Sequence, residues 1–231
     1  MRNRRTDKML LTTIQQQFEK LYQLPQHRTI EDFLINQETL STLQAGWRQV
    51  PAPAHCRGML LLSPHHDELG VAVYLDDRVL NNLAVHDPRS GLHANNLYDF
   101  CTMVEEVSHF LYVTWKAGNN RQMTRLEIEL QAEVDKFIFC SFYGAHQHNP
   151  DCGMPLKEIL FETFSLQHQL PQESQKRYLT ASKLALHYCH FLERRYMKKE
   201  LLRHLLGEIR QFYRFGQAEK ISHIHRSVLL H

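Results

Sequence analysis

The chain has 231 residues, of which 43% are hydrophobic and 10% aromatic, and it carries a net charge of +2. This composition excludes a chain that is disordered throughout and is typical of a globular protein with its own core. No apolar run approaches the roughly 20 residues of a membrane span. No secretory signal follows the basic residues 1–5, and the five scattered cysteines form no CxxC pair. We therefore expect a cytoplasmic protein without a membrane partner.

The N-terminal segment, residues 1–50, is expected to be helical. Apolar residues at helical spacing predict a helix over residues 8–22, and Pro25 ends it. Thr29 is expected to be the N-cap of a second, short helix.

The next segment predicts a β-hairpin. Residues 59–62 and 70–75 are short, apolar and partly β-branched, and the polar residues 63–68 between them form the expected turn. A short helix is predicted over residues 77–85.

Two long helices follow. The first is predicted from residue 95 to about residue 116 and is stopped at Gly118. The second begins at Thr124, which forms the sequence pattern of a capping box with Glu127, and runs to about Tyr143.

The C-terminal region, residues 155–231, is basic and predicts a helical bundle. Its expected helices cover residues 155–168, 172–197, 199–214 and 217–229. The predicted fold class is therefore α+β and predominantly helical, with one small hairpin before a buried helix pair. We expect the segments 1–50, 58–143 and 155–231 to pack together as one domain.

The first long helix is apolar on nearly all sides, yet it carries three ionisable residues. Glu105 and His109 are four residues apart and project from one face, and Glu106 points about a quarter turn away from them. A helix that is apolar all round is buried on most sides. These side chains are therefore expected to need partners inside the protein.

The second long helix repeats the anomaly. Glu133 falls in the middle of its apolar stripe, whereas Glu127, Gln131 and Asp135 are expected to face solvent and Glu129 to flank the stripe. A buried carboxylate without a partner is very costly. A short connection between the two helices is expected to bring Glu133 toward Glu105 and His109.

This trio has the chemistry of a metal site. Two carboxylates and one imidazole suit a divalent metal ion, with zinc favoured and manganese or iron as alternatives. The competing interpretation is a charge network, in which Glu133 pairs with the imidazolium of His109, with Lys136 or with Arg125.

The residues 105–109, EEVSH, resemble the HExxH motif of zincin metallopeptidases, and residues 131–137 resemble the Glu-Ala-x-x-Phe helix of small zincins. The resemblance covers about residues 58–143. It implies that Glu105 takes the place of the first histidine ligand, that Glu106 is the catalytic general base and that His109 is the second ligand. Glu133 would be the third ligand, with Glu129 as the alternative.

The resulting hypothesis is a divergent, zincin-like metal-dependent hydrolase of the peptidase type, acting on a protein or peptide. The first alternative is a non-enzymatic regulatory or adaptor protein in which a Glu-His-Glu network is structural. The second is nucleic-acid binding through the basic residues 176–226, which we favour less, because the same cations can face solvent or dock within the chain.

The other sequence motifs are weaker evidence for a function. His146, His148 and Cys152 share one predicted loop and form a weaker candidate for a structural metal. The chain has no Walker loop, GxGxxG or GxSxG motif, which disfavours a nucleotide-dependent enzyme or an α/β-hydrolase.

Overall fold

The computed structural model describes residues 4–26, 28–47, 56–65, 68–144, 156–161 and 172–229. The fold is α+β and predominantly helical, as predicted. The α-helices are α1 Arg4–Tyr22, α2 Gln37–Trp47, α3 Asp77–Val85, α4 Leu97–Gly118, α5 Arg125–Gly144, α6 Leu156–Phe161, α7 Gln172–Arg195, α8 Leu202–Arg214 and α9 Gln217–Leu229. Short 3-10 helices are η1 Ile30–Phe33, η2 Pro88–Ser90 and η3 Met197–Lys199, and the strands are β1 Leu34–Ile35, β2 Gly58–His65 and β3 Glu68–Leu75.

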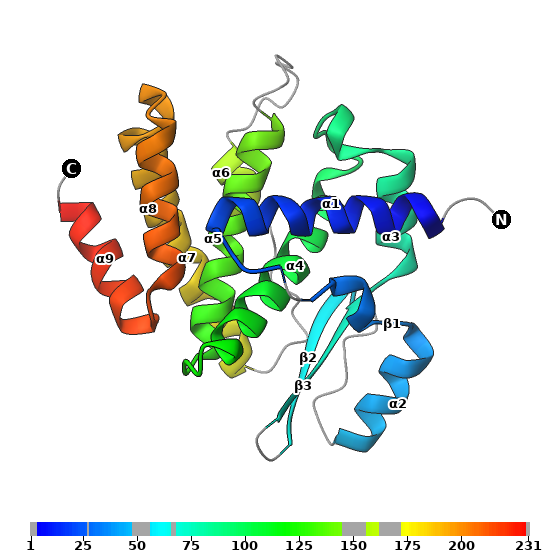
Figure 1. The fold of residues 1–231 in the computed structure, drawn as a ribbon. Coiled ribbons are helices and arrows are strands. Elements are labelled where there is room, and N and C mark those ends of the chain that lie inside the picture. Colours follow the sequence, from blue (N-terminus) through cyan, green and yellow to red (C-terminus); the bar gives the residue numbers. More distant parts are fainter. Residues whose placement is uncertain are drawn as a thin grey trace.

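The sheet is small and lies at one end of the helical body (Figure 1). Its strand order is β1-β3-β2, with β2 antiparallel and β1 parallel to β3. Alternate residues of β3 face opposite ways, as the pleat requires. Val73 joins the main core, whereas Ala72 packs with Leu40 of α2 and Leu61 of β2. Because β3 lies between β1 and β2, β2 is an edge strand among the described strands, and it lies against α4.

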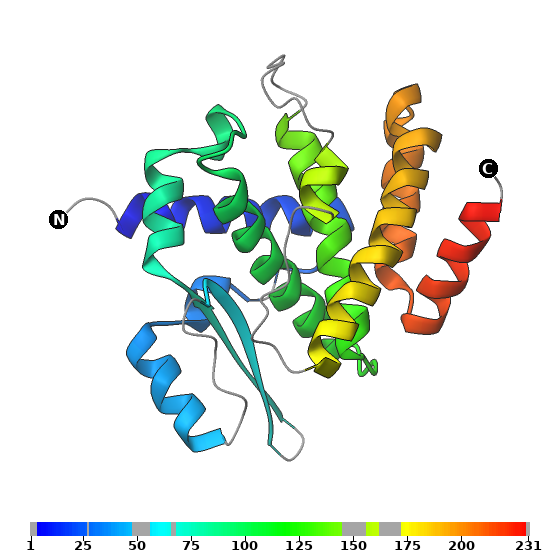
Figure 2. The same cartoon turned by 180° about the vertical axis from the view of Figure 1, so that it is seen from behind.

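Helices α4 and α5 form the centre of the molecule. Figures 1 and 2 show α1 lying across this pair on one side and α7 packing along it on the other. Helices α8 and α9 complete the layer at the end remote from the N-terminus. Phe110 of α4 and Leu130 of α5 are both fully buried, so the pair is enclosed on most sides, as expected from its apolar sequence. None of the described helices is long and apolar enough to cross a bilayer.

Most predicted elements are confirmed, and the differences are local. Helix α2 and strand β1 were not predicted, and β2 and β3 run further into the polar connection than the apolar residues suggested. Thr29 precedes η1, but its side chain makes no capping hydrogen bond. The group His146, His148 and Cys152 lies outside the described residues.

Helix α8 is tied to the end of α1 by two arginines. Arg210 Nε donates to the carbonyl oxygen of Leu21 at 2.6 Å, and Arg214 Nη2 donates to that of Tyr22 at 3.0 Å. The last carbonyls of a helix have no partner within the helix, so these bonds satisfy two of them. Some cations of the basic C-terminal region are thus used inside the protein.

The prediction that Glu127, Gln131 and Asp135 face solvent is wrong, because all three are at most 2% exposed. Helices α1, α8 and α9 cover this side of α5, and the local pattern of the helix does not reveal them. The three residues belong to a buried group that we call the inner polar network. Its members are Tyr22, Ser108, Tyr112, Lys116, Glu127, Gln131, Asp135 and Lys220.

Every member of the inner polar network has a hydrogen-bond or ion-pair partner within it. Glu127 accepts from Tyr112 at 2.5 Å and lies 2.5 Å from Lys116 Nζ. The backbone N–H of Glu127 donates to Thr124 at 3.1 Å, so the threonine caps α5 as predicted, although the Glu127 side chain does not return the bond. Lys220 Nζ donates to Gln131 Oε1 at 2.6 Å, and burial lowers the pKa of the Lys220 ammonium group to about 7.

Asp135 is the acidic centre of the network. It accepts from the hydroxyls of Tyr22 and Ser108 and from Gln131 Nε2, the last at 3.0 Å. Burial raises the pKa of its carboxyl to about 6, although these hydrogen bonds lower it. Compared with the unfolded chain, the folded protein therefore favours the protonated carboxyl of Asp135.

Asp135→Asn should remove a pH dependence of stability. Because the folded-state pKa lies above the ordinary 3.8, the wild-type stability is full below about pH 4 and falls as the pH rises through about 6. The loss should be on the order of 3 kcal/mol relative to the variant. Urea unfolding of both proteins from pH 4 to pH 8 measures it, and a constant difference between them would contradict the assignment.

Candidate metal centre

Three side chains from the helix pair bring potential metal ligands together. Glu105 and His109 lie one turn apart on α4, and Glu129 comes from α5. One donor atom of each lies within 4.8 Å of the others. His109 Nε2 is 3.3 Å from Glu129 Oε2, and both side chains are about nine-tenths buried. We call these three residues the donor group.

Glu133, the third ligand suggested by the sequence, lies one turn further along α5 and has a different partner. Lys136 Nζ is 2.9 Å from Glu133 Oε1 and 2.9 Å from Glu105 Oε2. The contacts of Ser108 with Asp135 and of Glu105 with Lys136 put His109 level with residues 132–134 of α5, so the register alone does not select Glu129. Glu133 is held by Lys136, whereas the Glu129 side chain reaches His109 Nε2. Glu129, the alternative ligand implied by the zincin resemblance, therefore completes the donor group.

Glu106 lies beside the donor group, under the start of β2. Its Oε2 is 3.7 Å from His109 Nδ1, which is too long for a hydrogen bond. A Cβ atom on Gly58 would come within 2.8 Å of Glu106 Cγ, so the backbone of β2 passes directly over this carboxylate. Burial, followed by the charge of Glu106, raises the pKa of the nearby Cys56 thiol to about 11.

Several polar atoms at this place have no hydrogen-bond partner. In the described part of the chain, four buried side-chain nitrogen or oxygen atoms lack one: Glu106 Oε2, His109 Nε2, Arg177 Nε and Tyr213 Oη. The first three converge, because Arg177 Nε is 3.9 Å from Glu129 Oε1. Buried polar groups in folded proteins are nearly always satisfied, so unsatisfied groups require an explanation.

The charges of the cluster do not balance. Glu105, Glu106, Glu129 and Glu133 contribute −4 when ionised, and Lys136 and Arg177 contribute +2, which leaves −2. Burial is the largest effect on the pKa of Glu106 and raises it.

His109 responds to the same excess of negative charge. Burial lowers its pKa, but Glu106 and Glu129 outweigh burial and raise it well above the ordinary value. The cluster therefore favours an additional positive charge, which can be a proton on His109 or a metal cation.

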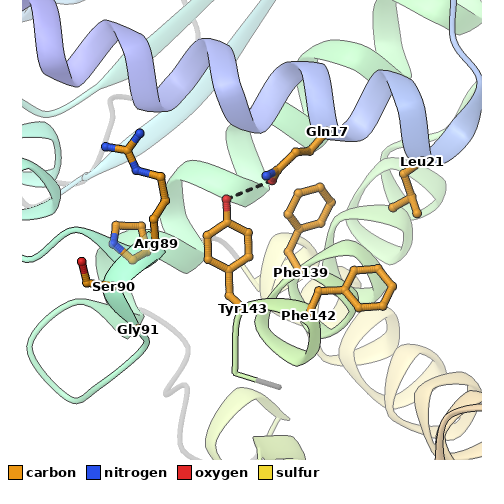
Figure 3. Close-up of a pocket in the computed structure, with 9 residues that line it drawn as sticks. Gln17, Leu21, Arg89, Ser90, Gly91, Phe139, Phe142 and Tyr143 are labelled. Atoms are coloured by element: carbon orange, nitrogen blue, oxygen red, sulfur yellow. Dashed lines mark hydrogen bonds between the residues drawn. The ribbon is translucent and has the colours of Figure 1, made fainter. Parts of the chain in front are cut away.

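A separate pocket lies on the other side of the molecule, between α1, η2 and α5 (Figure 3). It has a volume of about 400 Å³ and an aromatic wall that includes Phe139 and Tyr143. Tyr143 donates to Gln17 Oε1 at 2.9 Å, and Arg89 is paired with Asp87 at 2.6 Å. It shares no lining residue with the donor group, and its polar groups are paired in these ways.

No family model, curated protein or solved structure matches this chain, so what the centre can do has to be inferred from its own residues. Two of these residues were not anticipated from the sequence. Arg177 is one of many cations in a basic region, and no sequence pattern marks it as the one that turns inward. Gly58 matters only because the sheet and α4 meet there.

Gly58→Ala should destabilise the protein through Glu106. The added methyl group would lie 2.8 Å from Glu106 Cγ and 3.0 Å from Thr102 Cγ2, so strand or helix must shift. Overpacking of this kind costs about 1–3 kcal/mol. Chemical denaturation measures the loss.

Gly207→Ala in α8 is the matched control, since nothing lies within 4 Å of its added methyl group. Alanine is the better helix former by up to about 1 kcal/mol, so the control should gain stability. Equal stability of Gly58→Ala and the wild type would contradict the close approach of β2 to Glu106.

Proposed function

We propose that the chain binds a divalent metal ion, zinc in the first place, through Glu105, His109 and Glu129. We further propose that it acts as a divergent, zincin-like hydrolase of the peptidase type with Glu106 as general base. The observation that carries the proposal is the convergence of buried polar atoms without a hydrogen bond on a set of three potential ligands.

The inner polar network supports this interpretation by contrast. It is centred on the same two helices, is equally buried and contains charged residues, yet its members are paired with one another. The donor group lies on the opposite side of the pair, where His109 Nε2 and Glu106 Oε2 have ion-pair neighbours at 3.3 Å and 3.7 Å but no hydrogen bond. A purely structural cluster would be expected to resemble the inner polar network. A divalent cation would accept the lone pair of His109 Nε2 and bring the charge of the cluster to zero.

The residues around the donor group suit hydrolysis. A metal ion bound there would supply Lewis acidity, which polarises a carbonyl group and lowers the pKa of water. Glu106 is adjacent to His109 and is held in place by the backbone at Gly58. Burial raises the pKa of Glu106, and a raised pKa brings a carboxylate toward the range in which it takes up and returns a proton at neutral pH.

A non-enzymatic role is the second candidate, and Lys136 favours it. The ammonium group of Lys136 lies 2.9 Å from both Glu105 and Glu133, so one of the proposed ligands already has a cationic partner. In this alternative, His109 is an imidazolium between Glu106 and Glu129, and the cluster fixes the packing of α4 on α5.

A measurement of zinc binding distinguishes the metal-dependent hydrolase from the non-enzymatic structural network. Untagged protein should bind zinc, and His109→Asn and Glu129→Gln should each lower the affinity by at least an order of magnitude, because each removes one donor atom. Competition with a chromophoric chelator measures the affinity. A ligand at 100 times its Kd adds about 2.7 kcal/mol to stability, so zinc should also raise the melting temperature.

Glu133→Gln is the matched control for Glu129→Gln. It makes the same change one turn away on α5, at a carboxylate bound by Lys136, and should leave zinc affinity within a few fold. Absence of zinc binding by the wild type would favour the structural network. Equal losses in the two variants would contradict the assignment of Glu129 as the ligand.

Glu106→Gln should separate binding from chemistry. The amide keeps the size of the side chain but cannot act as a base, so zinc affinity should stay within a few fold of the wild type. Release of fluorescent peptides from labelled denatured casein should fall at least a hundredfold. Full activity of this variant would show that another group is the base.

A further inference from the structure

Arg177 is the part of the cluster that a metal ion alone does not explain. It lies near the start of α7 and directs Nε toward Glu129 Oε1, at 3.9 Å. Its Nη2 is 3.4 Å from Ser174 Oγ, and the guanidinium carbon lies 5.5 Å from the ring centre of Tyr178. The side chain is 17% exposed, and Nε itself is buried without a hydrogen-bond partner.

The chemistry of the unpartnered atoms differs between the residues. Glu106 Oε2 and an unprotonated His109 Nε2 are acceptors, and a metal ion with a bound water molecule can satisfy both. Arg177 Nε carries a hydrogen and can only donate, so a cation cannot satisfy it. The complete site therefore needs an oxygen atom in addition to a metal ion, placed between Arg177 and the donor group.

The charge balance indicates which kind of oxygen is suitable. The four carboxylates, the two basic side chains and a divalent ion sum to zero. A group with two negative charges would meet four neighbouring carboxylates, whereas one with a single negative charge meets less repulsion. Guanidinium also pairs with carboxylate through two parallel hydrogen bonds.

We propose that Arg177 binds a carboxylate of the substrate, so that the centre takes acyl compounds or peptides that carry a carboxylate close to the bond to be cleaved. This proposal rests on the function proposed above and deepens it. Arg177 is then a substrate-binding residue on a third helix, and α7 completes a site whose other groups come from α4 and α5.

The experiment uses the whole untagged protein loaded with Co²⁺, with acetate as the probe. Binding of acetate should change the visible absorption of the bound cobalt in a saturable way, and sulfate, a dianion, should bind more weakly. Arg177→Gln should weaken acetate binding at least tenfold. The same variant should bind Co²⁺ as tightly as the wild type or more tightly, because a cation next to the metal is removed.

Two further variants define what Arg177 contributes. Arg177→Lys keeps the charge but lacks the Nε donor and the planar group, so it should recover only part of the acetate affinity. Lys176→Gln removes the same charge from the neighbouring exposed position and should leave acetate binding unchanged.

Each outcome decides one question. If the wild type binds no Co²⁺, the proposed function fails, and the role of Arg177 fails with it. If Co²⁺ binds but acetate affinity is the same in Arg177→Gln and the wild type, only the role of Arg177 is overturned. Full affinity in Arg177→Lys would overturn the hydrogen-bonding role, and tighter binding of sulfate than of acetate would overturn the carboxylate preference.

Discussion

The structure depends on how charged side chains are accommodated between α4 and α5. Removing a charge from water is so costly that each buried ionic group must find a counter-charge or a set of hydrogen bonds. The helix pair meets this requirement on two sides. Toward α1, α8 and α9, every member of the inner polar network has a hydrogen-bond or ion-pair partner, and Tyr213 Oη beside it is the one described buried atom there without a hydrogen bond. Toward β2 and α7, the requirement is met only in part, and the remaining groups surround the donor group.

This difference in hydrogen bonding between the two sides of the helix pair is better evidence for a metal site than burial, because both sides are buried. Lys136 and Arg177 offset half of the negative charge around the donor group, and each also repels a further cation. The proposed metal affinity is therefore a balance between attraction to four carboxylates and repulsion from two basic residues. Lys136 is shared between Glu105 and Glu133, so Glu105 can turn toward a metal ion without leaving the ammonium wholly unpaired.

The sequence predicted the parts of this arrangement that are local. An apolar helix with Glu105 and His109 one turn apart is visible in the chain, as are the threonine cap of α5 and the hairpin. The choice between Glu129 and Glu133 was not local. It depends on which side chains of the two helices meet, because Lys136 bonds Glu133 whereas Glu129 lies beside His109.

The remaining errors have the same origin. Asp135 was expected to face solvent because the periodicity of α5 marks only one apolar face as buried. The periodicity does not indicate that α1 and α9 cover a second, polar face of this helix. The short strand β1 has only two residues and is defined by its parallel pairing with β3. Arg177 was missed because its significance comes from its distance to Glu129, a residue on a different helix.

The bonds from Arg210 and Arg214 to the end of α1 bear on how the chain folds as it leaves the ribosome. They join groups 189 and 192 residues apart, so the final carbonyls of α1 lack these partners until α8 has been synthesised. Until then Tyr22, whose ring stacks on Tyr213 of α8, cannot be fully shielded, and apolar surface of this kind attracts chaperones and promotes aggregation. Closure of the core at the end of α1 therefore has to follow the synthesis of α8, and contacts this distant in sequence form slowly.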